Sequence, residues 1–253
     1  MRLPSLVPRN SCRRVPALNT GNPLVSATVA LKLTPSTSLP SDPVANALVD
    51  KMVDERSDEF RERFANRHRK LAHVTELLRT TAQELRTQRF VTHLPIWNTC
   101  LYLNLASHDL SLLVQEASML RDNWHRLLIA RHIALLLYET TEDLRSLLGK
   151  TLREALDQLG LLATFEIQLK TARKPLDAFW DAHQPALKQI RIVSAAHRDL
   201  DALNTLDVIE SIDVHEFISL GTDFNKVLAG IAAALQEMLT DSSGIIPPGM
   251  KTK

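Results

Sequence analysis

Hydrophobic and polar positions follow the period of an α-helix along most of the chain. Apolar or small residues recur every third or fourth position from Leu71 to Leu85, and again from Phe217 to Leu239, which places them on one helix face. The segment Trp124–Leu148 is apolar almost all round at its middle, so we expect a central helix surrounded by others and ended by Gly149. The pattern predicts an all-α protein, an up-and-down helical bundle.

Prolines and capping residues give the expected boundaries of these helices. We expect a break around Pro95, because proline lacks the N–H that a helix interior needs, and breaks or first-turn positions at Pro175 and Pro185. Asp213, followed three residues later by Glu216, resembles a capping box and predicts the start of the last helix.

Composition divides the chain into one domain and two loose ends. Residues 1–42 are rich in Pro, Ser, Thr and Asn, and residues 1–41 hold five basic residues and no acid. We expect them to be disordered, a targeting or secretion signal, or a stretch upstream of a misplaced start codon. Residues 43–241 are predicted to form a single helical bundle, and 242–253 a flexible tail. Val44–Phe64 is either a separate first helix or an extension of the next one.

Few glycines and cysteines exclude several classes of protein. The chain has seven glycines and neither a Gly-x-Gly-x-x-Gly nor a Gly-Lys-Ser/Thr loop, so we expect no nucleotide cofactor. Cys12 and Cys100 form no spaced pair, which favours a reducing, cytoplasmic location without disulfides. The longest apolar run of interest, Ile133–Tyr138, is far too short to span a membrane.

Metal and triad signatures are missing from the sequence. There is no His-Glu-x-x-His, no Cys-x-x-Cys and no Glu-x-x-His, so we expect no metal site. Three acidic residues cluster on the predicted central helix, and we expect them to be solvated or salt-bridged: Glu139, Glu142 and Asp143. Ser107, His108 and Asp109 are adjacent on a helix and point in different directions, so an N-cap at Ser107 or Asp109 is favoured over catalysis.

A basic cluster is the strongest local concentration of charge, and it consists of Arg61, Arg63, Arg67, His68, Arg69 and Lys70. Five permanent positive charges within ten residues could bind a phosphate backbone or an acidic partner. The interleaved Glu62 and the lack of an aromatic stacking platform favour a solvated helix face instead.

A second basic segment, Gln189-Ile-Arg-Ile-Val-Ser-Ala-Ala-His-Arg-Asp199, precedes the last helix and contains an Arg-x5-His unit. Steps of three residues place Arg191, Ser194 and His197 on one slanted polar ridge of a helix. In its Ala-His-Arg-Asp context and its place in the chain, the segment resembles the motif of the HEPN superfamily, particularly abortive-infection and toxin-type members, over about residues 124–240. The resemblance implies a small bundle of four or five helices that forms a homodimer, in which the paired motifs make a metal-independent ribonuclease site.

On that resemblance, Arg191 and His197 are the expected catalytic residues, with Ser194 beside them. A guanidinium can clamp a scissile phosphate, and an imidazole can move the proton of a ribose 2′-hydroxyl, so the pair would cleave RNA through a 2′,3′-cyclic phosphate. The resemblance further implies toxin–antitoxin or phage-defence function and an antitoxin or other protein partner. Active members usually have a polar residue where this chain has Ile192, so a non-catalytic helical interaction module is the alternative. A secreted effector is a third hypothesis, based only on residues 1–42.

Overall fold

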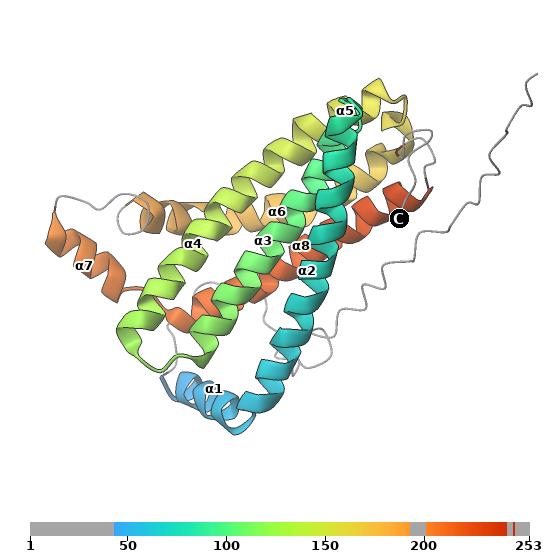
Figure 1. The fold of residues 1–253 in the computed structure, drawn as a ribbon. Coiled ribbons are helices and arrows are strands. Elements are labelled where there is room, and N and C mark those ends of the chain that lie inside the picture. Colours follow the sequence, from blue (N-terminus) through green and yellow to red (C-terminus); the bar gives the residue numbers. More distant parts are fainter. Residues whose placement is uncertain (1–42, 193–200, 242–244, 246–253) are drawn as a thin grey trace, which may run out of the picture.

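The computed structural model describes residues 43–192, 201–241 and 245, and the all-α prediction is confirmed there (Figure 1). The helices in chain order are α1 (Pro43–Glu55), α2 (Ser57–Thr87), α3 (Leu94–Met119), α4 (Asn123–Ser146), the π-helix η1 (Leu147–Thr151), α5 (Leu152–Gln158), α6 (Leu162–Ile190), α7 (Ala202–Glu210) and α8 (Val214–Asp241). No strand occurs in the part of the chain that the structure describes. Ser194 and His197 lie outside these residues, as do 1–42 and most of 242–253.

The first three helices refine the expected boundaries. Val44–Phe64 belongs to two helices, because the backbone turns at Arg56, where φ is −118° and ψ is 24°. We predicted a break around Pro95, and that prediction was wrong. Pro95 lies in the first turn of α3, where its missing N–H would have had no partner in any case. The break falls earlier, between the end of α2 and His93.

The central helix is α4, but Gly149 does not end it, so that prediction was wrong. The chain continues through η1, which is wound more widely than an α-helix, directly into α5. The helical path ends only at Gly160, whose φ of +70° is one that L-residues with side chains rarely adopt. Gly149 lies inside η1, so it allows close packing against this turn and does not act as a helix stop.

The prediction that Pro175 and Pro185 mark breaks or first turns was also wrong. Both lie inside α6, and both are exposed on its outer face. A proline interior to a helix removes the hydrogen bond to the carbonyl four residues earlier, here those of Thr171 and Asp181. Because both of these residues are exposed, water can replace the lost donors while the inner face of α6 stays buried.

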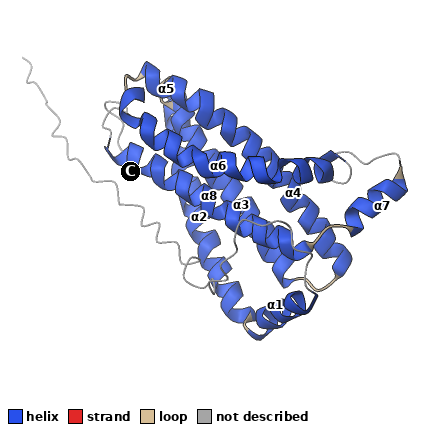
Figure 2. Ribbon diagram, turned by 180° about the vertical axis from the view of Figure 1, so that it is seen from behind, coloured by secondary structure: helices blue, strands red, loops and turns tan. Residues whose placement is uncertain are grey.

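Helices α3, α4, α6 and α8 surround one apolar core, which α5 and α7 extend (Figure 2). Its fully buried members include Leu110, Ile133, Leu137, Leu176 and Phe224. Figure 2 shows α6 and α8 running across the face of the bundle opposite α2. Among the described helices, none combines the length and apolar character needed to cross a bilayer.

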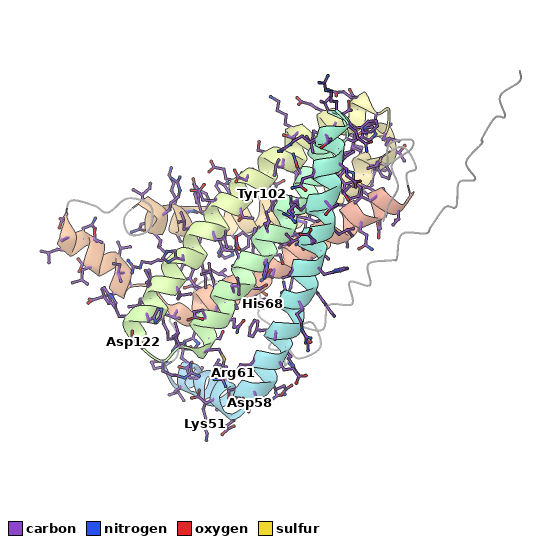
Figure 3. The ribbon with its side chains drawn as sticks, viewed as in Figure 1. Lys51, Asp58, Arg61, His68, Tyr102 and Asp122 are labelled. Carbon is purple, nitrogen blue, oxygen red and sulfur yellow. The ribbon has the colours of Figure 1, made fainter. Side chains whose placement is uncertain are left out.

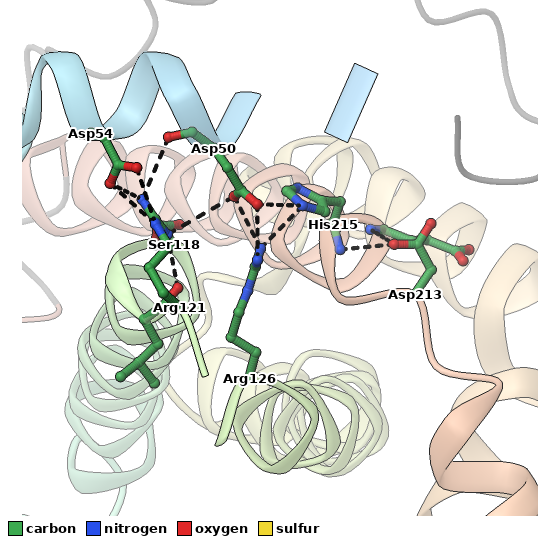
Figure 4. Close-up of polar contacts among 9 residues, drawn as sticks. Asp50, Asp54, Ser118, Arg121, Arg126, Asp213 and His215 are labelled. Carbon is green, nitrogen blue, oxygen red and sulfur yellow. Dashed lines mark hydrogen bonds and ion pairs between the residues drawn. The ribbon is translucent and has the colours of Figure 1, made fainter. Parts of the chain in front are cut away.

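Polar contacts fix α1 and the start of α8 (Figure 4). Asp50 accepts hydrogen bonds from the buried Arg126 at 3.0 and 3.3 Å, and Asp54 pairs with Arg121. His215 Nε2 lies 3.1 Å from a guanidinium nitrogen of Arg126, and burial, followed by the Arg126 charge, lowers the pKa of His215. This set ties the first helix to α4 and α8.

The predicted cap of the last helix is present. Asp213 accepts hydrogen bonds from the backbone N–H groups of His215 at 2.9 Å and Glu216 at 3.4 Å. These are N–H groups of the first turn that have no partner within the helix. The sequence signal at Asp213 therefore places the start of α8 correctly.

Candidate functional site

Arg191 lies at the end of α6, where its guanidinium contacts the neighbouring helix α4. Its Nε donates a hydrogen bond to Glu139, and its guanidinium carbon lies 5.1 Å from the centre of the Tyr138 ring. The Glu139 carboxylate raises the pKa of Arg191, which keeps the guanidinium positively charged. The side chain is about one third exposed, at 32%. Arg191 is thus bound within its own chain and remains accessible from solvent.

The other two predicted catalytic residues, Ser194 and His197, lie outside the described residues. Their predicted ridge with Arg191 stays a prediction. Of the three, the structure places only Arg191, and it brings that residue to Glu139 and Tyr138.

Two aromatic rings continue from Arg191 along the seam between α4 and α6. Tyr138 on α4 packs against Trp180 on α6, with ring centroids 5.2 Å apart. Arg145, two turns further along α4, lies over the other ring, 5.2 Å from the Trp180 centroid. An arginine–aromatic series of this kind holds each guanidinium in a fixed place without burying it.

Further arginines follow Arg145 toward η1 and α5. The carboxylate of Asp177 accepts hydrogen bonds from Arg145 at 2.8 Å and from Arg173 at 2.9 Å. Farther along the same seam, Glu166 lies 3.0 Å from Arg153 and 3.1 Å from Lys170. We call the five cations of this seam the basic row: Arg145, Arg153, Lys170, Arg173 and Arg191.

The basic row forms because α6 runs antiparallel to the continuous path of α4, η1 and α5. Residues that increase in number on one side meet residues that decrease on the other, from Glu139–Arg191 to Arg153–Glu166. The five cations share three carboxylates, those of Glu139, Glu166 and Asp177, so positive charge exceeds negative by two. The row is an elongated strip in which cations outnumber their paired carboxylates, although the charge of Glu142 also acts on Arg191.

The basic cluster of α2 is arranged differently. Arg61 and Arg63 pair with Asp58 and Glu59 on their own helix, in agreement with a solvated face (Figure 3). Arg67 departs from that expectation and turns inward. Its guanidinium donates to three neutral side chains, those of Ser111 at 2.7 Å, Ser107 at 3.1 Å and Asn225 at 3.0 Å. Burial lowers the pKa of Arg67.

The contacts of Ser107 correct another prediction. Ser107 and Asp109 lie in the middle of α3, so neither is an N-cap. The hydroxyl of Ser107 instead donates to Asn225 on α8 at 3.0 Å and accepts from Arg67. Hydrogen bonding across three helices explains the polar residue at this position.

The three acidic residues of α4 are salt-bridged or exposed to solvent, as predicted. Glu139 binds Arg191, and Asp143 accepts a hydrogen bond from the hydroxyl of Tyr102 at 2.7 Å. Glu142 is exposed. No group of three or more His, Cys, Asp or Glu side chains suited to a metal ion occurs in the described part of the chain.

The sequence pattern did not indicate the basic row as a functional site. Its members come from α4, α5 and α6, and no two of them are closer in sequence than Lys170 and Arg173. Comparison of the chain with protein-family models, curated proteins and solved structures found no match. The function must therefore be argued from the geometry of the chain.

Proposed function

We propose that this protein is a non-catalytic helical module that binds single-stranded RNA along the basic row. The observation that carries the proposal is a line of five cations that share only three carboxylates. Measured along α6 from Glu166, the partner of Arg153, to Arg191, the line is about 38 Å long at the rise of an α-helix. A small anion cannot reach all of these cations, whereas a polyanionic backbone can.

RNA is the polyanion that agrees with the HEPN-like motif at Arg191, His197 and Ser194. The non-catalytic form of the proposal is supported by the position of Arg191, which is already bound by Glu139 and Tyr138 of its own chain. Because the Nε of Arg191 is bound to Glu139, its terminal nitrogens can contact a backbone phosphate, but the full guanidinium is not free to clamp a scissile one. The apolar Ile192 beside it, 46% exposed, adds no hydrogen-bonding group to the site.

The test compares two pairs of arginines in binding to a labelled 20-nucleotide RNA that carries a 5′-hydroxyl. We expect Arg145→Gln/Arg191→Gln to weaken binding about tenfold, because each lost phosphate contact removes electrostatic free energy. The matched control is Arg61→Gln/Arg69→Gln on α2, which removes the same charge and should leave the affinity nearly unchanged. Equal loss in both variants would assign binding to net charge alone, and absence of binding by the unaltered protein would refute the proposal.

A metal-independent ribonuclease is the second candidate, because Arg191 is one third exposed and directly precedes the segment with Ser194 and His197. In this form the protein acts as a homodimer in a toxin–antitoxin or phage-defence system and is restrained by an antitoxin. Labelled RNA is incubated with the purified protein in EDTA. Cleavage that both Arg191→Ala and His197→Ala abolish would establish the ribonuclease, while RNA left intact supports the non-catalytic module.

A further inference from the structure

A cleft of about 370 Å³ opens at the far end of the basic row, where η1 faces α6. Leu148 and Leu169 form the apolar part of its lining, and Arg153, Lys170 and Arg173 supply three cations. Its volume lies at the lower end of the range for small-molecule sites, which suits a ligand group the size of a phosphate with part of a nucleotide. The cleft is partly open to solvent, and its lining combines three cations with apolar side chains.

The widened turn η1 determines how Arg173 enters this cleft. A Cβ atom placed on Gly149 would lie 2.5 Å from a terminal guanidinium nitrogen of Arg173, closer than any real contact. The guanidinium therefore occupies space that a side chain at position 149 would take. Single turns of π-helix inside longer helices are frequent at functional sites, and within this turn the missing side chain of Gly149 leaves room for a cation against the backbone.

The cations of the cleft retain hydrogen-bonding capacity. Arg173 uses its Nε for Asp177, and Arg153 uses one terminal nitrogen for Glu166. Among the described residues, the terminal nitrogens of Arg173 and the second terminal nitrogen of Arg153 have no hydrogen-bond acceptor. Lys170, whose side chain is 65% exposed, shares Glu166 with Arg153. Three positive charges thus face one carboxylate in the lining.

We propose that this cleft binds a terminal phosphate group, either on a free phosphorylated compound or at the 5′ end of RNA. Arg173 and Arg153 donate to the phosphate oxygens through their uncommitted N–H groups, and Lys170 adds a third charge. A terminal phosphate carries more negative charge than a backbone phosphodiester, so it gains more from three converging cations. The RNA form of this proposal rests on the proposed RNA-binding function, whereas the free-phosphate form does not.

The first arm of the test uses pyrophosphate as the probe, with binding measured by calorimetry. We expect the unaltered protein to bind, Arg173→Gln to weaken binding at least tenfold, and Arg61→Gln, on α2 outside the basic row, to leave it unchanged. Gly149→Ala keeps every charge but displaces the Arg173 guanidinium, so it should weaken binding as well. Circular dichroism verifies that each variant is folded.

The second arm compares the same RNA with a 5′-phosphate and with a 5′-hydroxyl. We expect the phosphorylated RNA to bind about tenfold more tightly, and this preference to disappear in Arg173→Gln. Pyrophosphate binding with no such preference, or with no RNA binding at all, identifies a free phosphorylated compound as the ligand. Failure of pyrophosphate to bind, together with equal affinity for the two RNA ends, would overturn the cleft proposal and leave RNA binding by the rest of the row intact.

Discussion

The basic cluster of α2 and the basic row between α4 and α6 contain similar numbers of arginines but differ in how those arginines are assembled. In the cluster, the cations are neighbours in sequence, and the helix itself supplies carboxylates one turn away for Arg61 and Arg63. In the row, the cations come from three helices, and pairs of them share one carboxylate. High charge density along a sequence therefore does not produce the same density in space, because partners three or four residues away neutralise part of it locally. Lys170 and Arg173 of the row also have such partners on α6, but these carboxylates are shared with Arg153 and Arg145 from the facing helices.

Arg67 is the member of the cluster that should matter most for stability. Arg67→Ala removes three hydrogen bonds of a charged donor that links α2, α3 and α8. We expect the free energy of unfolding to fall by about 2 kcal/mol, roughly a thirtyfold change in the folding equilibrium. Urea denaturation measures this change in the free energy of unfolding. An unchanged midpoint would mean that the buried guanidinium costs as much free energy as its hydrogen bonds return.

The salt dependence of RNA binding is the second way to distinguish the basic row from the basic cluster of α2. If Arg145 and Arg191 each contact one phosphate, their replacement by Gln should reduce the slope of log affinity against log salt concentration by about 1.4. The Arg61→Gln/Arg69→Gln control should retain the full slope. Fluorescence anisotropy over a range of NaCl concentrations gives both values. A slope reduced equally in the control would place the RNA across α2 as well.

Acid should destabilise the protein in part through His68 on α2, whose ring packs at a tilt against that of His108 with centroids 5.4 Å apart. Burial, then the charges of His108 and Arg67, lower the pKa of His68, and burial also lowers the pKa values of His183 and His215. These three histidines therefore bind protons less readily in the folded state than in the unfolded state. Their contribution to the free energy of unfolding is complete above about pH 6.5 and declines as the pH falls below that value.

The measurement is the free energy of unfolding at pH 7.5 and pH 5.5. We expect a lower value at pH 5.5 and a smaller decrease for His68→Gln, whose side chain does not titrate. A decrease of the same size in that variant would assign the pH effect to His183 and His215, and a constant free energy would contradict all three pKa directions.

The smallest effect is expected at the exposed pairs of the cluster. Arg61→Ala breaks an ion pair with Asp58 whose side chains are 64% and 97% exposed. Such pairs contribute little because water and salt screen them, so the free energy of unfolding should change by less than about 0.5 kcal/mol. Urea denaturation of Arg61→Ala and Arg67→Ala under the same conditions compares their free energies of unfolding. If Arg61→Ala lost as much as Arg67→Ala, Arg61 would not belong to a solvated face.

Local signals in the sequence were sufficient for much of the fold. The three- and four-residue spacing predicted much of α2 and α8, the segment that is apolar almost all round predicted α4, and Asp213 predicted the start of α8. These predictions succeed because periodicity and capping depend on neighbours within one or two turns. Pro175, Pro185 and Gly149 misled for the converse reason: their effect on a helix depends on what packs against them.

The sequence by itself determined that the chain forms amphipathic helices, because burial of an apolar stripe is encoded in the spacing of the residues that form it. It also indicated Arg191 as a residue of interest, although not its contacts. Only the tertiary structure decided that Arg191 meets Glu139, that Arg67 turns inward to neutral partners, and that five cations line up between α4 and α6. Those contacts join residues up to 158 positions apart, so they depend on how whole helices pack and no local pattern specifies them.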